Sequence, residues 1–210
     1  VVAAGLSKYN LSGPVDLPPR DGRLRILVPG QVEDDASIRM GAVDLRSNEA
    51  LLKAVRQAYP TAFIIYKPHP DVVAGLRIGA VADAGVLADM VIHRAAPAAL
   101  FAQVDRVATL TSLMGFEALM HGLPVTCFGL PFYAGWGLTD DRATPPARRR
   151  ARPDLDQLAQ AVLIDYPLYR DPLTGAACPP EVLVERMVAG HGKQPWYLRS
   201  LARLQRVLRL

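Results

Sequence analysis

Four polar segments of the sequence contain residue types that could carry chemistry. The first extends from Gln31 to Ser37 and holds three consecutive acids, Glu33, Asp34 and Asp35. Because neighbouring side chains of an extended loop point in different directions, at most one or two of these acids can face a single site. A carboxylate there could serve as a nucleophile, a general base or a metal ligand. The alternative is an acidic surface loop that caps the helix after it.

The second segment places a histidine between two prolines, as Lys67-Pro68-His69-Pro70. The prolines restrict the backbone and hold the imidazole in one direction, which suits contact with a phosphate or protonation of a leaving group. Lys67 adds a positive charge nearby. A histidine between prolines is also common as a simple turn residue, so this segment alone decides nothing.

The third segment, TSLMGFEAL, begins with Thr111 and Ser112 and contains Glu117. Hydroxyls and backbone N–H groups at a helix N-terminus bind anions. Glu117 follows about one helical turn later and could accept both hydroxyls of a ribose. It could instead be the capping-box partner of an upstream hydroxyl, which needs no ligand. Together with the Gly-x-Pro stop that follows, the segment favours a nucleotide-sugar pocket.

The fourth segment, residues 129–141, has the sequence GLPFYAGWGLTDD. Its glycines and aromatic residues predict a shaped loop and not a regular element. Aromatic faces suit a sugar ring or a base, and the alternative is a loop packed on itself.

Short apolar runs alternate with helical patterns and would position these segments. We expect strands over residues 24–29, 62–66, 104–109 and 125–128. We expect helices from about residue 48, over 96–103 and over 116–121. The run at 85–94 fits either a strand or a short helix. This alternation predicts an α/β fold with a Rossmann-like parallel sheet, and such sheets bind ligands beyond the carboxyl ends of their strands.

Composition narrows the class of protein. Half of the 210 residues are hydrophobic and 21% are charged, which is typical of a globular protein. The two cysteines, Cys127 and Cys178, are too few for a disulfide framework, and no Cys/His cluster has zinc spacing. No run is long enough to cross a membrane. We interpret the start, which has no Met and no signal pattern, as a position within a longer protein.

We expect three regions: a connector over residues 1–22, a nucleotide-sugar-binding domain over 23–150 and a helical extension over 151–210. Residues 1–141 carry a net charge of −2 and residues 142–210 a net charge of +6. Basic segments attract anions such as nucleic acid, lipid headgroups or sugar phosphates, although a solvated helix face has the same composition. The sequence lacks the aromatic–basic signature of RNA-binding modules, so we expect no nucleic acid partner.

The C-terminal tail from Trp196 onward predicts a basic amphipathic helix. Four arginines share one helical stripe, Arg199, Arg203, Arg206 and Arg209. Such a helix suits an anionic membrane surface. The alternative is a helix that crosses back onto the other half of an enzyme.

The order of the four segments resembles the bacterial capsule polysaccharide β-Kdo transferases of the KpsC (LipB) type. QVEDDAS, YKPHPD, TSLMGFEAL with HGLPV, and GLPFYAGWGLTDDR carry this resemblance, which covers roughly residues 5–190. It implies the C-terminal half of a GT-B-like glycosyltransferase, whose N-terminal half would be a partner in forming the cleft.

The resemblance also implies a function. Such enzymes are retaining β-Kdo transferases that use CMP-Kdo and build the Kdo linker on a glycolipid acceptor for capsule polysaccharide export. CMP-Kdo is then the donor substrate, with no cofactor and no metal. The expected location is the cytoplasm, peripheral to the inner membrane.

The family's acidic motif maps onto Gln31, Asp35 and Ser37, with Ser37 on the substrate-binding side. Asp35 is the expected nucleophile of a glycosyl-enzyme intermediate, and Asp34 and Glu33 are its rivals. Retention by double displacement requires one such ionised carboxylate. The sequence leaves the choice among the three acids open.

The remaining motifs imply contacts with CMP. His69 and Ser112, with Thr111, match the residues that meet the phosphate, Glu117 matches the ribose-binding acid, and Lys67 is a further phosphate candidate. CMP departs as a phosphate monoester, and these groups can stabilise its charge without a metal. Two other functions remain open, a non-catalytic nucleotide-sugar-binding or interaction module and a retaining hexosyltransferase that uses UDP- or GDP-sugars.

Overall fold

The computed structural model of the protein describes Val2 and residues 15–191. The chain divides into two compact units, with the change from one to the other between Leu155 and Asp156. The predicted amphipathic tail lies outside the described residues, together with its arginines, Arg199, Arg203, Arg206 and Arg209. No helix in the described part of the chain is both long and apolar enough to cross a membrane.

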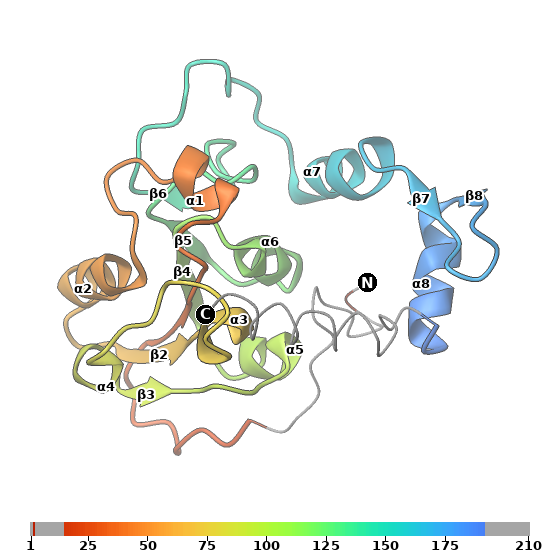
Figure 1. Ribbon diagram of the computed structural model, residues 1–210. Helices are drawn as coiled ribbons and strands as arrows, with labels where there is room; N and C mark the ends of the chain where they lie inside the picture. The colour runs from red at the N-terminus through yellow and green to blue at the C-terminus, as the bar shows by residue number, and fades with distance from the viewer. Residues whose placement is uncertain (1, 3–14, 192–210) are drawn as a thin grey trace. The chain divides into compact units, whose positions relative to one another are not determined.

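A six-stranded sheet forms the centre of the first unit (Figure 1). Its strands are β1 (Arg25–Pro29), β2 (Phe63–Lys67), β3 (Met90–Val91), β4 (Arg106–Thr109), β5 (Val125–Cys127) and β6 (Asp140–Asp141). They pair in the order β3-β2-β1-β4-β5-β6, and each pairing is parallel. This is the doubly wound order, so the predicted Rossmann-like parallel sheet is confirmed.

The central strands are continuous apolar runs because helices cover both faces of the sheet. The helices are α1 (Ala36–Gly41), α2 (Asn48–Ala58), α3 (Pro70–Val73), α4 (Ala84–Leu87), α5 (Pro97–Phe101) and α6 (Leu113–Met120). Side chains of α1, α2 and α4 pack in one cluster with Ile26 and Ile64. Leu27 and Ile65 alternate with these residues along β1 and β2, so they face the other side of the sheet, where they are equally buried.

Two helix starts show how local sequence sets the boundaries. Ser47 caps α2 by accepting a hydrogen bond from the Ala50 N–H at 3.1 Å. The segment after Asp35 forms α1, because Asp35 caps it and Ile38 is buried. The ambiguous run at 85–94 contains both alternatives, the end of α4 and then β3.

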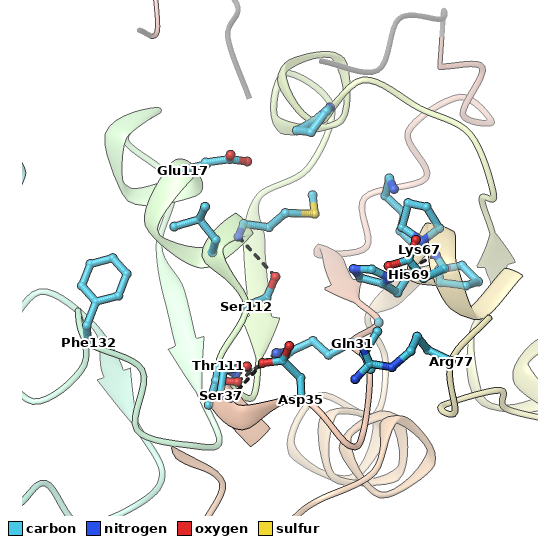
Figure 2. A pocket seen from close by; sticks show the side chains of 18 residues that line it. Gln31, Asp35, Ser37, Lys67, His69, Arg77, Thr111, Ser112, Glu117 and Phe132 are labelled. Carbon is cyan, nitrogen blue, oxygen red and sulfur yellow. Dashed lines mark hydrogen bonds and ion pairs between the residues drawn. The ribbon is translucent and has the colours of Figure 1, made fainter. Parts of the chain in front are cut away.

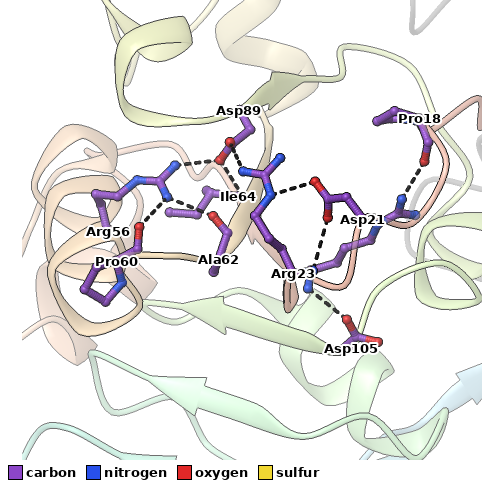
Figure 3. Close-up of polar contacts among 10 residues, drawn as sticks. Pro18, Asp21, Arg23, Arg56, Pro60, Ala62, Ile64, Asp89 and Asp105 are labelled. Atoms are coloured by element: carbon purple, nitrogen blue, oxygen red, sulfur yellow. Dashed lines mark hydrogen bonds and ion pairs between the residues drawn. The ribbon is translucent and has the colours of Figure 1, made fainter.

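Ion pairs hold the amino edge of the sheet, opposite the edge with the polar segments (Figure 3). Asp89 precedes β3 and pairs with Arg56 at 2.6 Å and Arg23 at 2.7 Å. Burial alone would raise the pKa of Asp89, but the Ile64 N–H and the two guanidiniums lower it to about 2. Asp105 precedes β4 and accepts a hydrogen bond from the backbone N–H of Arg25 at 2.8 Å. These contacts fix the positions at which β3 and β4 begin.

The second unit begins within α7. It contains most of α7 (Leu155–Gln160), a π-helical turn η1 (Ala161–Asp165), a hairpin of β7 (Tyr169–Arg170) and β8 (Ala177–Cys178), and α8 (Pro180–Val188). The sequence predicted a helical extension over residues 151–210 and did not predict the hairpin. Asp171 and Arg186 join the hairpin to α8 with a 3.2 Å ion pair.

Candidate active site at the carboxyl edge of the sheet

A pocket of about 390 Å³ lies at the carboxyl ends of β1, β2 and β4 (Figure 2). The strand order reverses between β1 and β4, which is the switch point where doubly wound sheets bind ligands. Eight of the ten residues predicted for the site line this pocket: Gln31, Asp35, Ser37, Lys67, His69, Thr111, Ser112 and Glu117.

Glu33 and Asp34 lie outside the pocket lining, and other groups hold their carboxylates. Glu33 accepts a hydrogen bond from the Asn48 N–H at 2.8 Å, at the start of α2. Asp34 accepts two hydrogen bonds from Arg77, at 2.8 and 3.1 Å. Successive side chains of the loop point in different directions, so only Asp35 of the three acids reaches the pocket.

Asp35 combines the two roles that the sequence offered as alternatives, a helix cap and a carboxylate in the site. It is the N-cap of α1, where one carboxylate oxygen accepts a hydrogen bond from the Ser37 N–H at 2.8 Å. It also lines the pocket. The cap fixes the direction of the side chain, and a fixed carboxylate is what an in-line attack on a sugar requires.

His69 caps the short helix α3 with its ring. Its Nδ1 accepts a hydrogen bond from the Asp71 N–H at 3.1 Å. A neutral imidazole that accepts at Nδ1 carries its proton on Nε2. The ring lines the pocket, so it can serve there as an N–H donor to an anion.

Lys67 brings a buried positive charge to the pocket. It ends β2 and is only 5% exposed. In the described ranges no carboxylate lies within 4.0 Å of its ammonium, and burial lowers the pKa of Lys67. A buried cation without an acidic neighbour is stabilised by an anionic ligand.

Gln31 connects two of the strand ends. Its amide donates to Thr111 Oγ1 at 2.8 Å and accepts from the Thr111 N–H at 2.9 Å. The same oxygen accepts a third, longer hydrogen bond from Thr109 at 3.3 Å. Gln31, which was predicted as part of the catalytic motif, lines the pocket, and its buried amide also holds the loop after β4.

The start of α6 borders the pocket, with Ser112, Leu113 and Met114 in the lining. Ser112 is the N-cap and accepts a hydrogen bond from the Met114 N–H at 3.2 Å. Glu117 is buried and follows the cap by five residues, whereas a capping box requires three. The capping-box alternative for Glu117 is therefore wrong, and its carboxylate lines the pocket.

The aromatic loop, residues 129–141, packs against the start of α6. Tyr133 is fully buried and donates its hydroxyl proton to the Ser112 carbonyl at 2.5 Å. Phe132 is half-exposed and lines the pocket. Arg149, from the basic stretch 147–152, donates to the carbonyls of Pro131 and Ala134 at 2.7 and 2.6 Å. Most of the loop is thus packed, and Phe132 is the aromatic face that it offers to a ligand.

Arg77, which no sequence motif predicted, lines the pocket from the loop between α3 and α4. Its partner Asp34 is 43 positions away in the chain. No periodicity or motif marks this loop, so only the packing of the loop beside β1 reveals the residue.

Comparison with known proteins places the chain in a family. Residues 17–169 match the family described as capsule polysaccharide biosynthesis protein. The capsule polysaccharide modification protein LipA of Neisseria meningitidis serogroup A is 47% identical over 185 residues, which are 87% of this chain and 26% of LipA. The lipopolysaccharide-processing protein LpsZ of Rhizobium meliloti is 46% identical over 174 residues, which are 80% of this chain and 39% of LpsZ. The chain therefore spans well under half the length of either relative.

Two solved structures are similar to this chain. The beta Kdo 2,7 transferase of Thermosulfurimonas dismutans KpsC matches with a TM-score of 0.73 and 41% identity, over 82% of this chain and 55% of that one. The beta Kdo 2,4 transferase of the same KpsC matches with a TM-score of 0.78 and 34% identity, over 89% and 59%. The resemblance to the KpsC type is confirmed, although the meningococcal relative is LipA and not LipB. The chain belongs to the capsule polysaccharide biosynthesis protein family.

Proposed function

We propose that this chain is the nucleotide-sugar-binding half of a retaining β-Kdo transferase that uses CMP-Kdo. One observation carries the proposal. A single pocket combines a carboxylate, Asp35, with a histidine, His69, a helix N-terminus at Ser112 and a buried acid, Glu117. The similarity to the two Kdo transferase structures supports the same function.

In the proposed mechanism, the donor phosphate lies between His69 and the N-terminus of α6, and Glu117 accepts hydrogen bonds from the ribose. Asp35 attacks the anomeric carbon, and the bond to the phosphate breaks with its electron pair on the leaving oxygen. An acceptor hydroxyl then displaces Asp35 and releases its proton. Two displacements at one carbon retain the configuration. The proposal includes no metal and no cofactor beside the donor.

The proposal extends to the setting of the reaction. The acceptor would be a glycolipid, and the product the Kdo linker of a capsule polysaccharide. This chain spans 55% and 59% of the two Kdo transferase structures, so the rest of the cleft would come from the N-terminal half of a module. Contact with the cytoplasmic surface of the inner membrane stays a prediction, which rests on the basic amphipathic pattern of the sequence from Trp196 onward.

The first test is recognition of the nucleotide by Glu117. We expect the chain to bind CMP about tenfold more tightly than 2′-deoxy-CMP, because Glu117 accepts a charge-assisted hydrogen bond from the 2′-hydroxyl. Glu117→Gln, which keeps the shape and removes the charge, should bind both ligands with nearly equal affinity. Isothermal titration calorimetry measures each Kd.

UDP is the competitor in the same titrations. Binding of UDP as tight as that of CMP would favour a hexosyltransferase that uses UDP-sugars. Unchanged discrimination by Glu117→Gln would remove Glu117 from the ribose site. CMP binding without any sugar transfer by the complete protein would favour the non-catalytic module.

Lys67→Met tests the buried charge. We expect about tenfold weaker CMP binding, since one charge-assisted contact is lost. We also expect the unliganded variant to be more stable than the wild type at neutral pH. Because the pKa of Lys67 in the folded chain lies below 10.5, the unfolded chain binds more protons as the pH approaches that value. The free energy of unfolding of the wild type should therefore rise as the pH increases toward 10.5. In Lys67→Met this contribution to the pH dependence should be absent.

Urea unfolding at several pH values measures the effect, and Lys53→Met is the matched control. Lys53 is exposed and pairs with Glu49 on its own helix. Lys53→Met should change neither the pH dependence of the free energy of unfolding nor the affinity for CMP. A Lys67→Met variant that binds CMP as well as the wild type would show that the ammonium meets no part of the nucleotide.

A further inference from the structure

Arg77 is a pocket cation that the proposed mechanism leaves without a role. It lies in the loop between α3 and α4, and its guanidinium points into the pocket beside Asp35 and His69 (Figure 2). Its side chain is 38% exposed. A ligand in this pocket can therefore reach it directly.

The backbone that carries Arg77 is firmly anchored. The Arg77 N–H donates to the Asp71 carbonyl at 3.3 Å, and the Glu33 N–H donates to the Ile78 carbonyl at 3.2 Å. The buried amide of Asn48 donates to the Gly79 carbonyl at 2.8 Å. Gly79 has a φ of +132°, and a Cβ there would stand 2.7 Å from the Gln31 carbonyl oxygen, so the loop closes against β1 as only glycine permits.

Asp34 sets the direction of the guanidinium. It binds the edge formed by Nε and Nη2, at 3.1 and 2.8 Å. An arginine has five N–H donors in a planar fork. Within residues 15–191 Arg77 makes no hydrogen bond through Nη1, so that edge can bind a second anion. Asp34, Asp35 and Asp71 all raise the pKa of Arg77, and the group is a permanent cation near the proposed nucleophile.

We propose that Arg77, positioned by Asp34, binds the carboxylate of the donor sugar and so selects donors whose anomeric carbon bears a carboxylate. This inference rests on the proposed function. Kdo is a 2-keto acid sugar, and a carboxylate nucleophile that approaches its anomeric carbon meets a second negative charge. A guanidinium beside Asp35 offsets that repulsion and orients the sugar at once. A neutral hexose has no carboxylate and would form no ion pair with Arg77.

Calorimetric titration of the chain with CMP and with CMP-Kdo, without acceptor, tests the assignment. We expect Arg77→Gln to weaken CMP-Kdo binding about tenfold and to leave the Kd for CMP within about twofold, because CMP lacks the carboxylate. Asp34→Asn should act in the same direction with a smaller loss. Arg39→Gln is the matched control, since Arg39 is exposed on α1 and does not line the pocket. It should change neither affinity.

Each outcome has one meaning. Equal losses of CMP and CMP-Kdo affinity in Arg77→Gln would assign Arg77 to the phosphate and overturn the inference, and no loss of either would overturn it too. A wild-type chain that binds no CMP would overturn the proposed function itself. Should Arg77→Gln fail to fold by circular dichroism, Arg77→Lys serves instead. It keeps the charge without the fork and should lose CMP-Kdo affinity selectively, but less than tenfold.

Discussion

Asp35→Asn is expected to lower sugar transfer about a thousandfold or more in the complete protein that carries this chain, because an amide cannot form the glycosyl-enzyme bond. Asparagine caps helices as well as aspartate does, so α1 should keep its start and the variant its stability. Incubation with CMP-Kdo in the absence of acceptor should add the mass of one Kdo residue to the wild type and none to the variant. Intact mass spectrometry measures the adduct.

Two other aspartates make this experiment specific. Asp83 is the exposed N-cap of α4 and does not line the pocket, so Asp83→Asn should leave transfer unchanged. Asp34→Asn should still form the adduct, with a higher KM for the donor, because it disturbs Arg77 and not the nucleophile. An adduct that persists in Asp35→Asn and disappears in Asp34→Asn would reverse the assignment.

Gly115→Ala is expected to destabilise the chain by about 3 kcal/mol, because an added Cβ would stand 2.1 Å from the Tyr133 hydroxyl. Tyr133 is fully buried and cannot move aside without opening the core. In an unobstructed helix the same substitution stabilises by about 1 kcal/mol, so the sign of the change reports the contact. Urea unfolding with CMP titration of the folded variant measures both stability and the pocket.

Gly85→Ala is the matched control, because Gly85 also lies in a helix, α4, and nothing stands within 4 Å of its added Cβ. It should be neutral or stabilising. Combining Gly115→Ala with Tyr133→Phe removes the closest contact but leaves a ring carbon at 2.8 Å, so we expect partial recovery. A Gly115→Ala chain as stable as the wild type would mean that Tyr133 does not hold α6.

The sequence was sufficient to predict strands β1, β2, β4 and β5 and to predict that the site residues come together, but β6 lies in a segment that was expected to be a loop. Strands β1 and β2 are buried on both faces, and such strands are short apolar runs that a linear pattern reveals. Parallel strands place their carboxyl ends at one edge, so segments that follow different strands converge without any long-range information. This is why eight of ten predicted residues line one pocket. Their roles with CMP-Kdo stay predictions.

Tertiary packing decided which residues of those segments reach the pocket. Asp35 faces it while its neighbour Asp34 pairs with Arg77, a distinction between adjacent acids that depends on a loop 43 positions away. Tyr133 is buried against α6, although its motif predicted an aromatic face for a ligand. A local pattern encodes where the backbone turns, because that depends on near neighbours. The direction of a side chain at the turn depends on partners brought close only by folding.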